Sequence, residues 1–294
     1  MLKQNNSNGS RLHPGTRLGS VHLTVPDLAE SLAYYQQSVG LRVQWREGGS
    51  AMLGVGGQDL LALTEKPGAK LVPRRTGLYH FAIRVPSRAD LAGVLWNLIR
   101  TEMPIQGMAD HLVSEAIYLT DPHGNGIEIY RDRPPAEWRY ENDELRMDTL
   151  PLNYRELLAE RENDPALWNG LPHGTVLGHM HLHVASIPET EAFYQDQIGF
   201  DRTASIGGSA SFFSAGGYHH HLGANTWNGV GAPPPPPDST GLRYFTVILA
   251  ARGEIARLAE RLAAGGTGYE DRPDGLFVRD PSQNGILFTV ESAV

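Results

Sequence analysis

The stretch LGSVHLTVPDLAESLAYYQQSVGLRV, residues 18–43, returns later in the chain without a gap as LGHMHLHVASIPETEAFYQDQIGFDR, residues 177–202. In each copy, apolar residues first alternate with polar ones, as in a strand, and then recur at helical spacing up to a glycine. A second strand-like segment follows that glycine. Each copy therefore predicts a strand, a turn, an amphipathic helix and another strand.

Two further pairs of segments match at nearly the same distance along the chain. GLYHFAIRV (77–85) resembles GLRYFTVIL (241–249), and DPHGNGIEIY (121–130) resembles DPSQNGILFT (280–289). The offsets are 159 residues for His22 to His181, 164 for His80 to Tyr244 and 159 for Glu128 to Leu287. Three matches at nearly one offset indicate a duplicated half.

Each half divides again into two units of strand, helix and three shorter strands. We therefore expect an α+β fold of four βαβββ units that form two tandem domains of paired units. The helices are expected at about 27–39, 87–101, 187–198 and 252–264. The expected divisions are a disordered terminus (1–15), a first domain (16–134), a linker (135–174) with a short helix near 153–161, and a second domain (175–294). The segment GAPPPPPDST (231–240) is expected to be an extended surface connection, because proline removes backbone donors.

Composition narrows the classes of partner. The chain has 294 residues, a formal net charge of −8 and no cysteine. Disulfides and cysteine nucleophiles are therefore excluded, and a metal would need His, Asp or Glu ligands. No lysine or arginine block predicts binding to nucleic acid or to an anionic membrane. No apolar run approaches the roughly 18 residues of a membrane helix, so a cytoplasmic protein with a small-molecule partner is expected.

Three polar side chains face away from the apolar rows of their strands. Val21, Leu23 and Val25 leave His22 on the opposite face, and the same alternation places His80 and Glu128 opposite their apolar neighbours. If consecutive units curl into one barrel, these three residues meet in its lumen. Two imidazoles and one carboxylate with open positions form the facial arrangement of non-haem Fe(II), which Mn, Co, Ni and Zn also tolerate.

The stretch HLVSEAIYLTDPHGNGIEIYRD (111–132) indicates a family. Together with the four-unit layout it resembles the vicinal oxygen chelate superfamily (glyoxalase, bleomycin resistance and extradiol dioxygenase proteins), and it is most similar to two-domain, catechol-2,3-dioxygenase-like type I extradiol proteins. The elements of the extradiol signature are His111, Ile117-Tyr118, Asp121-Pro122, Gly124 and Glu128. Ala109 departs from it, because the family prefers glycine or a few other residues there.

The resemblance implies a ring-cleaving dioxygenase acting on a catechol-type aromatic with O2 at a mononuclear Fe(II), or another divalent metal such as Mn(II). It implies His22, His80 and Glu128 as metal ligands, with Tyr118 and His111 as catalytic groups. Because Tyr244 and Leu287 replace two ligands in the second half, the first half would be the active one. A homo-oligomer is also expected.

Two features of the sequence do not follow from the resemblance. The acid/base histidine that family members carry upstream of the second ligand is absent from residues 61–79. Two histidine clusters, His179/His181/His183 and His219–His221, have no assigned role; a further metal site using His181 with His219 or His221 is conceivable but ranks below the first. The alternatives are a glyoxalase-like metal-dependent lyase or isomerase, and a metal-free small-molecule binding or resistance protein.

Overall fold

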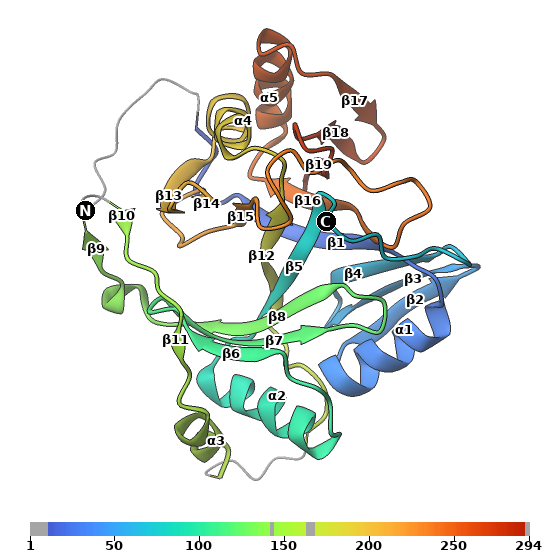
Figure 1. Cartoon of the computed structure of the whole chain (residues 1–294), viewed down its shortest axis with the longest axis vertical. Coiled ribbons are helices and arrows are strands. Elements are labelled where there is room, and N and C mark those ends of the chain that lie inside the picture. Colours follow the sequence, from blue (N-terminus) through green and yellow to red (C-terminus); the bar gives the residue numbers. More distant parts are fainter. Residues whose placement is uncertain (1–10, 142–143, 163–167, 292–294) are drawn as a thin grey trace.

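The computed structural model describes residues 11–141, 144–162 and 168–291. It confirms the α+β class and the four βαβββ units (Figure 1). Unit 1 contains β1 (Arg17–Val25), α1 (Leu28–Tyr34), β2 (Arg42–Glu47), β3 (Ser50–Val55) and β4 (Gln58–Glu65). Unit 2 contains β5 (Gly77–Arg84), α2 (Arg88–Arg100), β6 (Gly107–Asp110), β7 (Ser114–Thr120) and β8 (Gly126–Asp132).

The second half repeats this order. Unit 3 contains β12 (Val176–His183), α4 (Ile187–Glu191), β13 (Asp201–Ile206), β14 (Ala210–Ser214) and β15 (Leu222–Asn225). Unit 4 contains β16 (Gly241–Leu249), α5 (Arg252–Ala264), β17 (Tyr269–Arg272), β18 (Gly275–Arg279) and β19 (Gly285–Val290). Between the halves lie a short 3-10 helix (Pro135–Glu137), the short strands β9 (Tyr140–Glu141), β10 (Glu144–Leu145) and β11 (Leu150–Pro151), and α3 (Tyr154–Glu162), close to the helix expected near 153–161.

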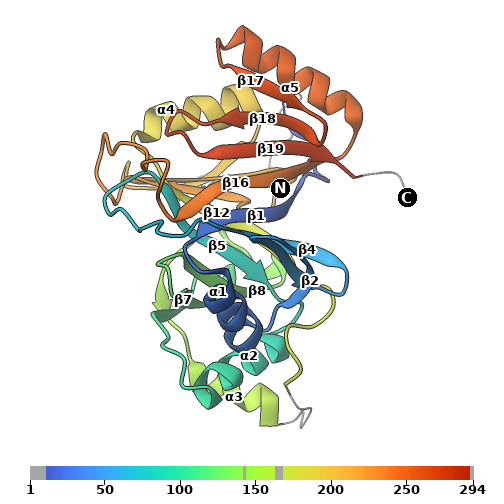
Figure 2. The ribbon, with the colours of Figure 1, turned by 90° about the vertical axis from the view of Figure 1, so that its right-hand side faces the viewer.

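The partner of each unit differs from the expectation. The eight-stranded sheet has the order β17-β18-β19-β16-β1-β4-β3-β2, and the nine-stranded sheet has the order β11-β6-β7-β8-β5-β12-β15-β14-β13. Unit 1 therefore shares a sheet with unit 4, and unit 2 shares one with unit 3, through antiparallel pairing of their first strands. The condition under which His22, His80 and Glu128 would meet, that consecutive units curl into one barrel, is not fulfilled. Alternation along a strand fixes its faces but not its neighbour. Figure 2 shows β1, β5, β12 and β16 running through the middle of the molecule.

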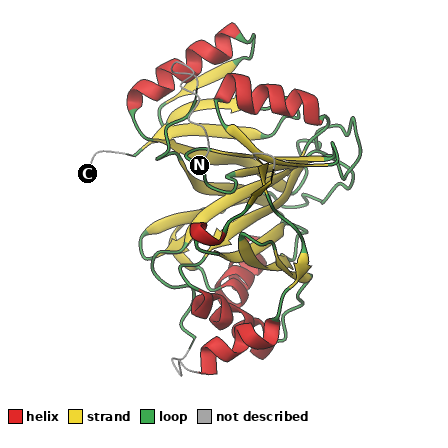
Figure 3. Cartoon of the chain, turned by 90° about the vertical axis from the view of Figure 1, so that its left-hand side faces the viewer, coloured by secondary structure: helices red, strands yellow, loops and turns green. Residues whose placement is uncertain are grey.

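The helices lie on the outer faces of the sheets, as Figure 3 shows. Asp27 begins α1, where its side chain accepts the backbone N–H of Glu30. After α1 and after α4 the chain widens into a π-helical turn, Tyr35–Val39 and Ala192–Ile198. Gly40 and Gly199 end these turns with positive φ, which glycine adopts without strain.

The Asp-Pro turn that both halves retain has a structural role. Tyr35 donates its hydroxyl proton to the Asp121 carboxylate over 2.9 Å, and Tyr194 donates to Asp280 over 3.1 Å. Each carboxylate also accepts backbone N–H groups of its own turn. These hydrogen bonds connect unit 1 to unit 2 and unit 3 to unit 4, so within each half they hold together the two units that the sheets do not join.

Residues 11–15 are ordered, in contrast to the expectation for residues 1–15. Leu12 is buried and its N–H donates to the Gly199 carbonyl, while Arg11 pairs with Asp201. Residues 1–10 lie outside the described residues. Among the described residues, every helix is too short or too polar to span a bilayer.

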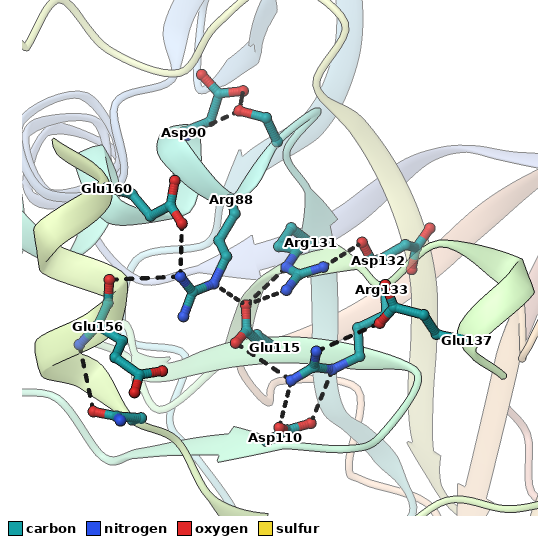
Figure 4. Close-up of polar contacts among 12 residues, drawn as sticks. Arg88, Asp90, Asp110, Glu115, Arg131, Asp132, Arg133, Glu137, Glu156 and Glu160 are labelled. Carbon is teal, nitrogen blue, oxygen red and sulfur yellow. Dashed lines mark hydrogen bonds and ion pairs between the residues drawn. The ribbon is translucent and has the colours of Figure 1, made fainter. Parts of the chain in front are cut away.

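A buried charge cluster braces the outer face of unit 2 (Figure 4). Glu115 on β7 is 3% exposed and lies 2.9 Å from Arg88 Nε, 2.6 Å from Arg131 Nη2 and 3.5 Å from Arg133 Nη2. Arg88 also pairs with Glu160 on α3 at 2.9 Å. The cluster ties α2 and α3 to β7 and β8, the strands that carry Tyr118 and Glu128.

Candidate metal centre

Three donor atoms converge inside the nine-stranded sheet. His80 lies on β5, Glu128 on β8 and His179 on β12; their ligand atoms all lie within 4.8 Å of one another, and all three side chains are buried. The Nε2 atoms of His80 and His179 lie 3.0 and 3.1 Å from Glu128 Oε2. Among the described residues, this is the one group of three His, Asp or Glu side chains with such spacing.

Strand register explains why these residues meet. β5 lies between β8 and β12, and Ala82 on β5 is paired with Glu128 on one side and with His179 on the other. The two longer side chains reach across the small alanine from strands that are two spacings, or about 10 Å, apart. His80 is two residues from Ala82 on the same face and supplies the third donor.

The donor set fits a divalent metal ion. Ligands about 2.1 Å from a metal and at right angles to one another are about 3.0 Å apart, which agrees with the two Nε2–Oε2 separations. His80 Nε2 is buried and, although it lies close to Glu128 Oε2, forms no hydrogen bond of acceptable geometry. Nδ1 of His179 is also buried without a hydrogen-bond partner. Two histidines and one carboxylate form the facial set that suits non-haem Fe(II).

The charge states of the group also suit a metal. Burial lowers the pKa of His80, although the neighbouring Glu128 opposes this, so its imidazole is neutral near pH 7. Burial alone would raise the pKa of Glu128, but His179 and His80 together hold that pKa well below its usual value. The site therefore holds a carboxylate and at least one imidazole free to donate a lone pair.

His22 lies elsewhere, so the predicted trio of His22, His80 and Glu128 is not assembled. β1 lies in the eight-stranded sheet, where His22 is paired with Tyr244 and its ring stacks on that tyrosine at a centroid distance of 4.0 Å. Its Nε2 lies 3.0 Å from Ser20 Oγ. Burial, followed by the charge of Arg243, lowers its pKa to about 4. His22 is a neutral, packed residue because units 1 and 2 do not share a sheet.

His111 and Tyr118 lie beside the group. Nδ1 of His111 donates to the Asp148 carbonyl over 2.7 Å, which leaves Nε2 to accept the Tyr118 hydroxyl proton over 2.6 Å. Burial, together with Glu128, raises the pKa of Tyr118 well above its usual value, so the phenol is neutral. Both residues line a cavity of about 310 Å³ that His80, Glu128, His179 and His220 also line.

The second-half histidines have definite places. His181 and His220 line the same cavity, and the His220 ring packs on His179 at 4.2 Å. His221 instead accepts the Ala215 N–H over 3.2 Å. The conceivable extra site of His181 with His219 or His221 does not form a three-ligand group within the described chain. His179 is the ligand candidate that the sequence interpretation missed.

A hydrogen-bonded chain sets the tautomer of His220. Asp132 Oδ1 lies 2.8 Å from His219 Nε2, and His219 Nδ1 lies 2.9 Å from His220 Nδ1. Burial opposes ionisation of Asp132, but His219 and then Arg84 lower its pKa, so it is a carboxylate that accepts the His219 proton. His219 Nδ1 then accepts from His220 Nδ1, which leaves His220 Nε2 without a proton. Burial lowers the pKa of His220 well below its usual value.

The eight-stranded sheet carries the same positions without the ligands. His80 is paired with His181 in one sheet, as Tyr244 is with His22 in the other. Ser20 stands at the repeat position of His179, and Leu287 at that of Glu128. Phe277 is paired with Leu287 as Tyr118 is with Glu128. The candidate centre is therefore confined to the sheet that units 2 and 3 share.

The fold and this donor set define a protein class. A family model described as the glyoxalase/bleomycin resistance protein/dioxygenase superfamily matches residues 17–129 and 176–288. The chain belongs to this superfamily, as the resemblance in its sequence indicated.

Individual relatives narrow the comparison. The chain is 42% identical over 275 residues to a protein of Bacillus subtilis (strain 168) named catechol-2,3-dioxygenase, covering 92% of this chain and 95% of that protein. A solved structure from Bacillus subtilis subsp. subtilis str. 168 covers 97% of this chain and 87% of its own, at 14% identity and a TM-score of 0.62. Glyoxalase I from Zea mays covers 94% of this chain and 92% of its own, at 13% identity and a TM-score of 0.59. The two structures bear on the fold alone.

Proposed function

We propose that the protein is an extradiol dioxygenase that opens the ring of a catechol-type aromatic with O2 at a mononuclear Fe(II) held by His80, Glu128 and His179. The observation that carries this proposal is the convergence of these three donors beside the hydrogen-bonded His111–Tyr118 pair. The relative named catechol-2,3-dioxygenase supports the same activity. A bound ferrous ion would leave positions for both catechol oxygens and O2 and would carry electron density between them.

The surrounding residues of the chain bind the substrate and move protons. His220 Nε2, kept free of a proton by the Asp132–His219 chain, accepts a proton from a catechol hydroxyl and returns it later. His220 thus supplies the acid/base histidine that is absent from residues 61–79. Tyr118, whose hydroxyl proton is donated to His111, accepts a hydrogen bond from a substrate hydroxyl through its phenol oxygen. Phe212 and Trp227 contribute apolar surface to the cavity and limit the water beside the reacting ring.

The reaction cleaves the ring bond between one hydroxylated carbon and its non-hydroxylated neighbour. Both atoms of O2 enter the product, and the substrate supplies the electrons, so no further reductant is needed. The neutral imidazole and phenol groups handle protons only. Mn(II) or another divalent ion would fit the same donors.

The test uses purified protein loaded anaerobically with Fe(II) and then given catechol and air. We expect one O2 consumed per catechol and a yellow ring-opened product. His179→Ala should abolish this product while retaining the circular dichroism spectrum of the parent. A loaded protein that consumes no O2 with any catechol yet isomerises a hemithioacetal would support the glyoxalase-like alternative. A protein that retains no divalent ion would support the metal-free binder. Cytoplasmic location and a homo-oligomer remain predictions.

A further inference from the structure

A larger cleft adjoins the candidate metal centre, and the proposed mechanism does not use it. Its volume is about 640 Å³, within the range of ligand sites, and it is lined by residues of the segments 71–80, 118–127 and 235–242. Tyr79, His80 and Tyr118 line both this cleft and the 310 Å³ cavity of the metal centre. The cleft and the cavity therefore share these three residues as a wall, and a substituent on a ring at the centre would pass them to enter the cleft.

The proline-rich segment gives this cleft a fixed wall. Thr76 donates its N–H to the Pro233 carbonyl over 3.1 Å and its hydroxyl proton to the Ser282 carbonyl over 2.7 Å. At the other end of the proline-rich segment 231–240, the backbone carbonyl of Lys70 accepts the Thr240 N–H over 3.1 Å. Proline also restricts the backbone of the segment itself. The cleft is thus formed before a ligand arrives, which reduces the entropy that binding must overcome.

The charged side chains that line the cleft are positive. Its lining includes Arg74 and Arg75 but no aspartate or glutamate, in a chain whose formal net charge is −8. Within the described part of the chain, neither guanidinium makes an ion pair or hydrogen bond. Arg74 has a φ of +56°, a conformation that costs a non-glycine residue free energy. The cleft therefore carries two guanidiniums without an ion-pair partner among the described residues.

We propose that this cleft binds an anionic substituent, a carboxylate, carried by the aromatic ring that the metal centre accepts. The inference rests on the proposed function and names the substrate class: a catechol bearing a carboxylate, in preference to a neutral one. A guanidinium presents paired N–H donors that match the two oxygens of a carboxylate, and two guanidiniums offset its charge in a partly enclosed cleft.

The experiment measures binding rather than turnover. Isothermal titration of the metal-loaded protein without O2 compares catechol 4-carboxylate with its neutral 4-carboxamide, and a second pair with a two-carbon spacer. The Arg74→Gln/Arg75→Gln double variant should bind the carboxylates about tenfold to a hundredfold more weakly than the parent. Its affinity for the carboxamides should change less than twofold. Arg46→Gln, on an exposed part of β2, is the matched control and should bind all four ligands as the parent does.

Two results would overturn the inference. One is an unchanged carboxylate affinity in the double variant, and the other is an equal loss for carboxylates and carboxamides, which would show general damage to the cavity. Added NaCl should weaken carboxylate binding alone, since ions screen a part-exposed charge pair. Turnover separates the two proposals. A parent protein that binds carboxylates through these arginines but consumes no O2 refutes the dioxygenase proposal only, whereas normal ring opening with no arginine effect refutes the cleft only.

Discussion

His179→Ala tests which residues form the metal centre. The sequence interpretation places His22 with His80 and Glu128, whereas the structure places His179 there, with its Nε2 atom 3.1 Å from Glu128 Oε2. Removing that imidazole leaves one histidine and one carboxylate, too few ligands for a facial site. His22→Ala removes a ring that stacks on Tyr244 in the other sheet and should leave the centre intact.

The expected size of the effect follows from linkage. A metal ion at a hundredfold excess over its Kd raises the free energy of unfolding by about 2.7 kcal/mol. An entropy of unfolding of about 2.1 cal/mol/K per residue gives about 1.6 °C per kcal/mol for a chain of this length, so the rise in Tm should be about 4 °C. The parent and His22→Ala should show this rise when Fe(II) or Mn(II) is added without O2. His179→Ala should show a rise of less than about 2 °C at the same concentration.

The assay is thermal unfolding of each protein with and without metal, together with elemental analysis after gel filtration. Each variant is compared with its own metal-free Tm, so a change in the stability of the apoprotein does not affect the result. His181→Ala is a further control, because that residue lines the cavity but lies outside the donor group. The reasoning fails if His179→Ala retains the full rise, or if His22→Ala loses it.

Four further predictions follow from the hydrogen bonds and charges around the site. Asp132→Asn should lower kcat about tenfold to a hundredfold with little change in KM, because His219 and then His220 lose their fixed tautomers; steady-state O2 uptake measures this, and a change in KM alone would contradict it. Tyr194→Phe should lower the free energy of unfolding in urea by about 1–3 kcal/mol, since Asp280 loses a donor; an unchanged midpoint would show that this hydrogen bond is not needed. Burial raises the pKa of Asp280 from 3.8 to about 6, so the folded protein favours its protonated form and stability falls as pH rises through that range. Relative to the parent, Asp280→Asn should therefore gain about 2.4 kcal/mol between pH 4 and pH 7, and a constant difference would refute this. Glu115→Ala should cost about 2–4 kcal/mol, a range that allows for the partial exposure of its arginine partners; a loss below 1 kcal/mol would mean that solvent screens the cluster.

Local structure was predictable to within a few residues. The expected helices at 87–101 and 252–264 correspond to α2 and α5, and those at 27–39 and 187–198 cover α1 and α4 with their π-helical turns. Apolar spacing gives the face and extent of a helix, but it does not show that the last turn widens. Strand partners could not be predicted, because the first strands of all four units have similar patterns and each could pair with any other.

The candidate site was predictable in part from the sequence. Comparison of the two repeated halves separates residues of the site from residues of the shared fold. His111, Tyr118 and Glu128 differ from their repeat partners, and all three lie at the centre. In the same alignment Ser20 occupies the position of His179. The position of His22 and His181, by contrast, is histidine in both copies. A residue that both copies retain serves the fold that they share. The comparison of the two copies therefore selects His179, and not His22, as a candidate metal ligand. Register shifts in the pairing of β12 with β5 then set which of its histidines faces Glu128, and the sequence carries no sign of these shifts.

The exchange of units between halves bears on how the protein can be dissected. Residues 17–132 contain His80 and Glu128, but His179 and the strand that aligns it come from residues 176–225. Each half expressed alone would expose the unpaired edge of two first strands, which invites aggregation. The two halves produced together from separate genes should instead reassemble, and binding of a divalent metal ion would show that β5 has paired with β12.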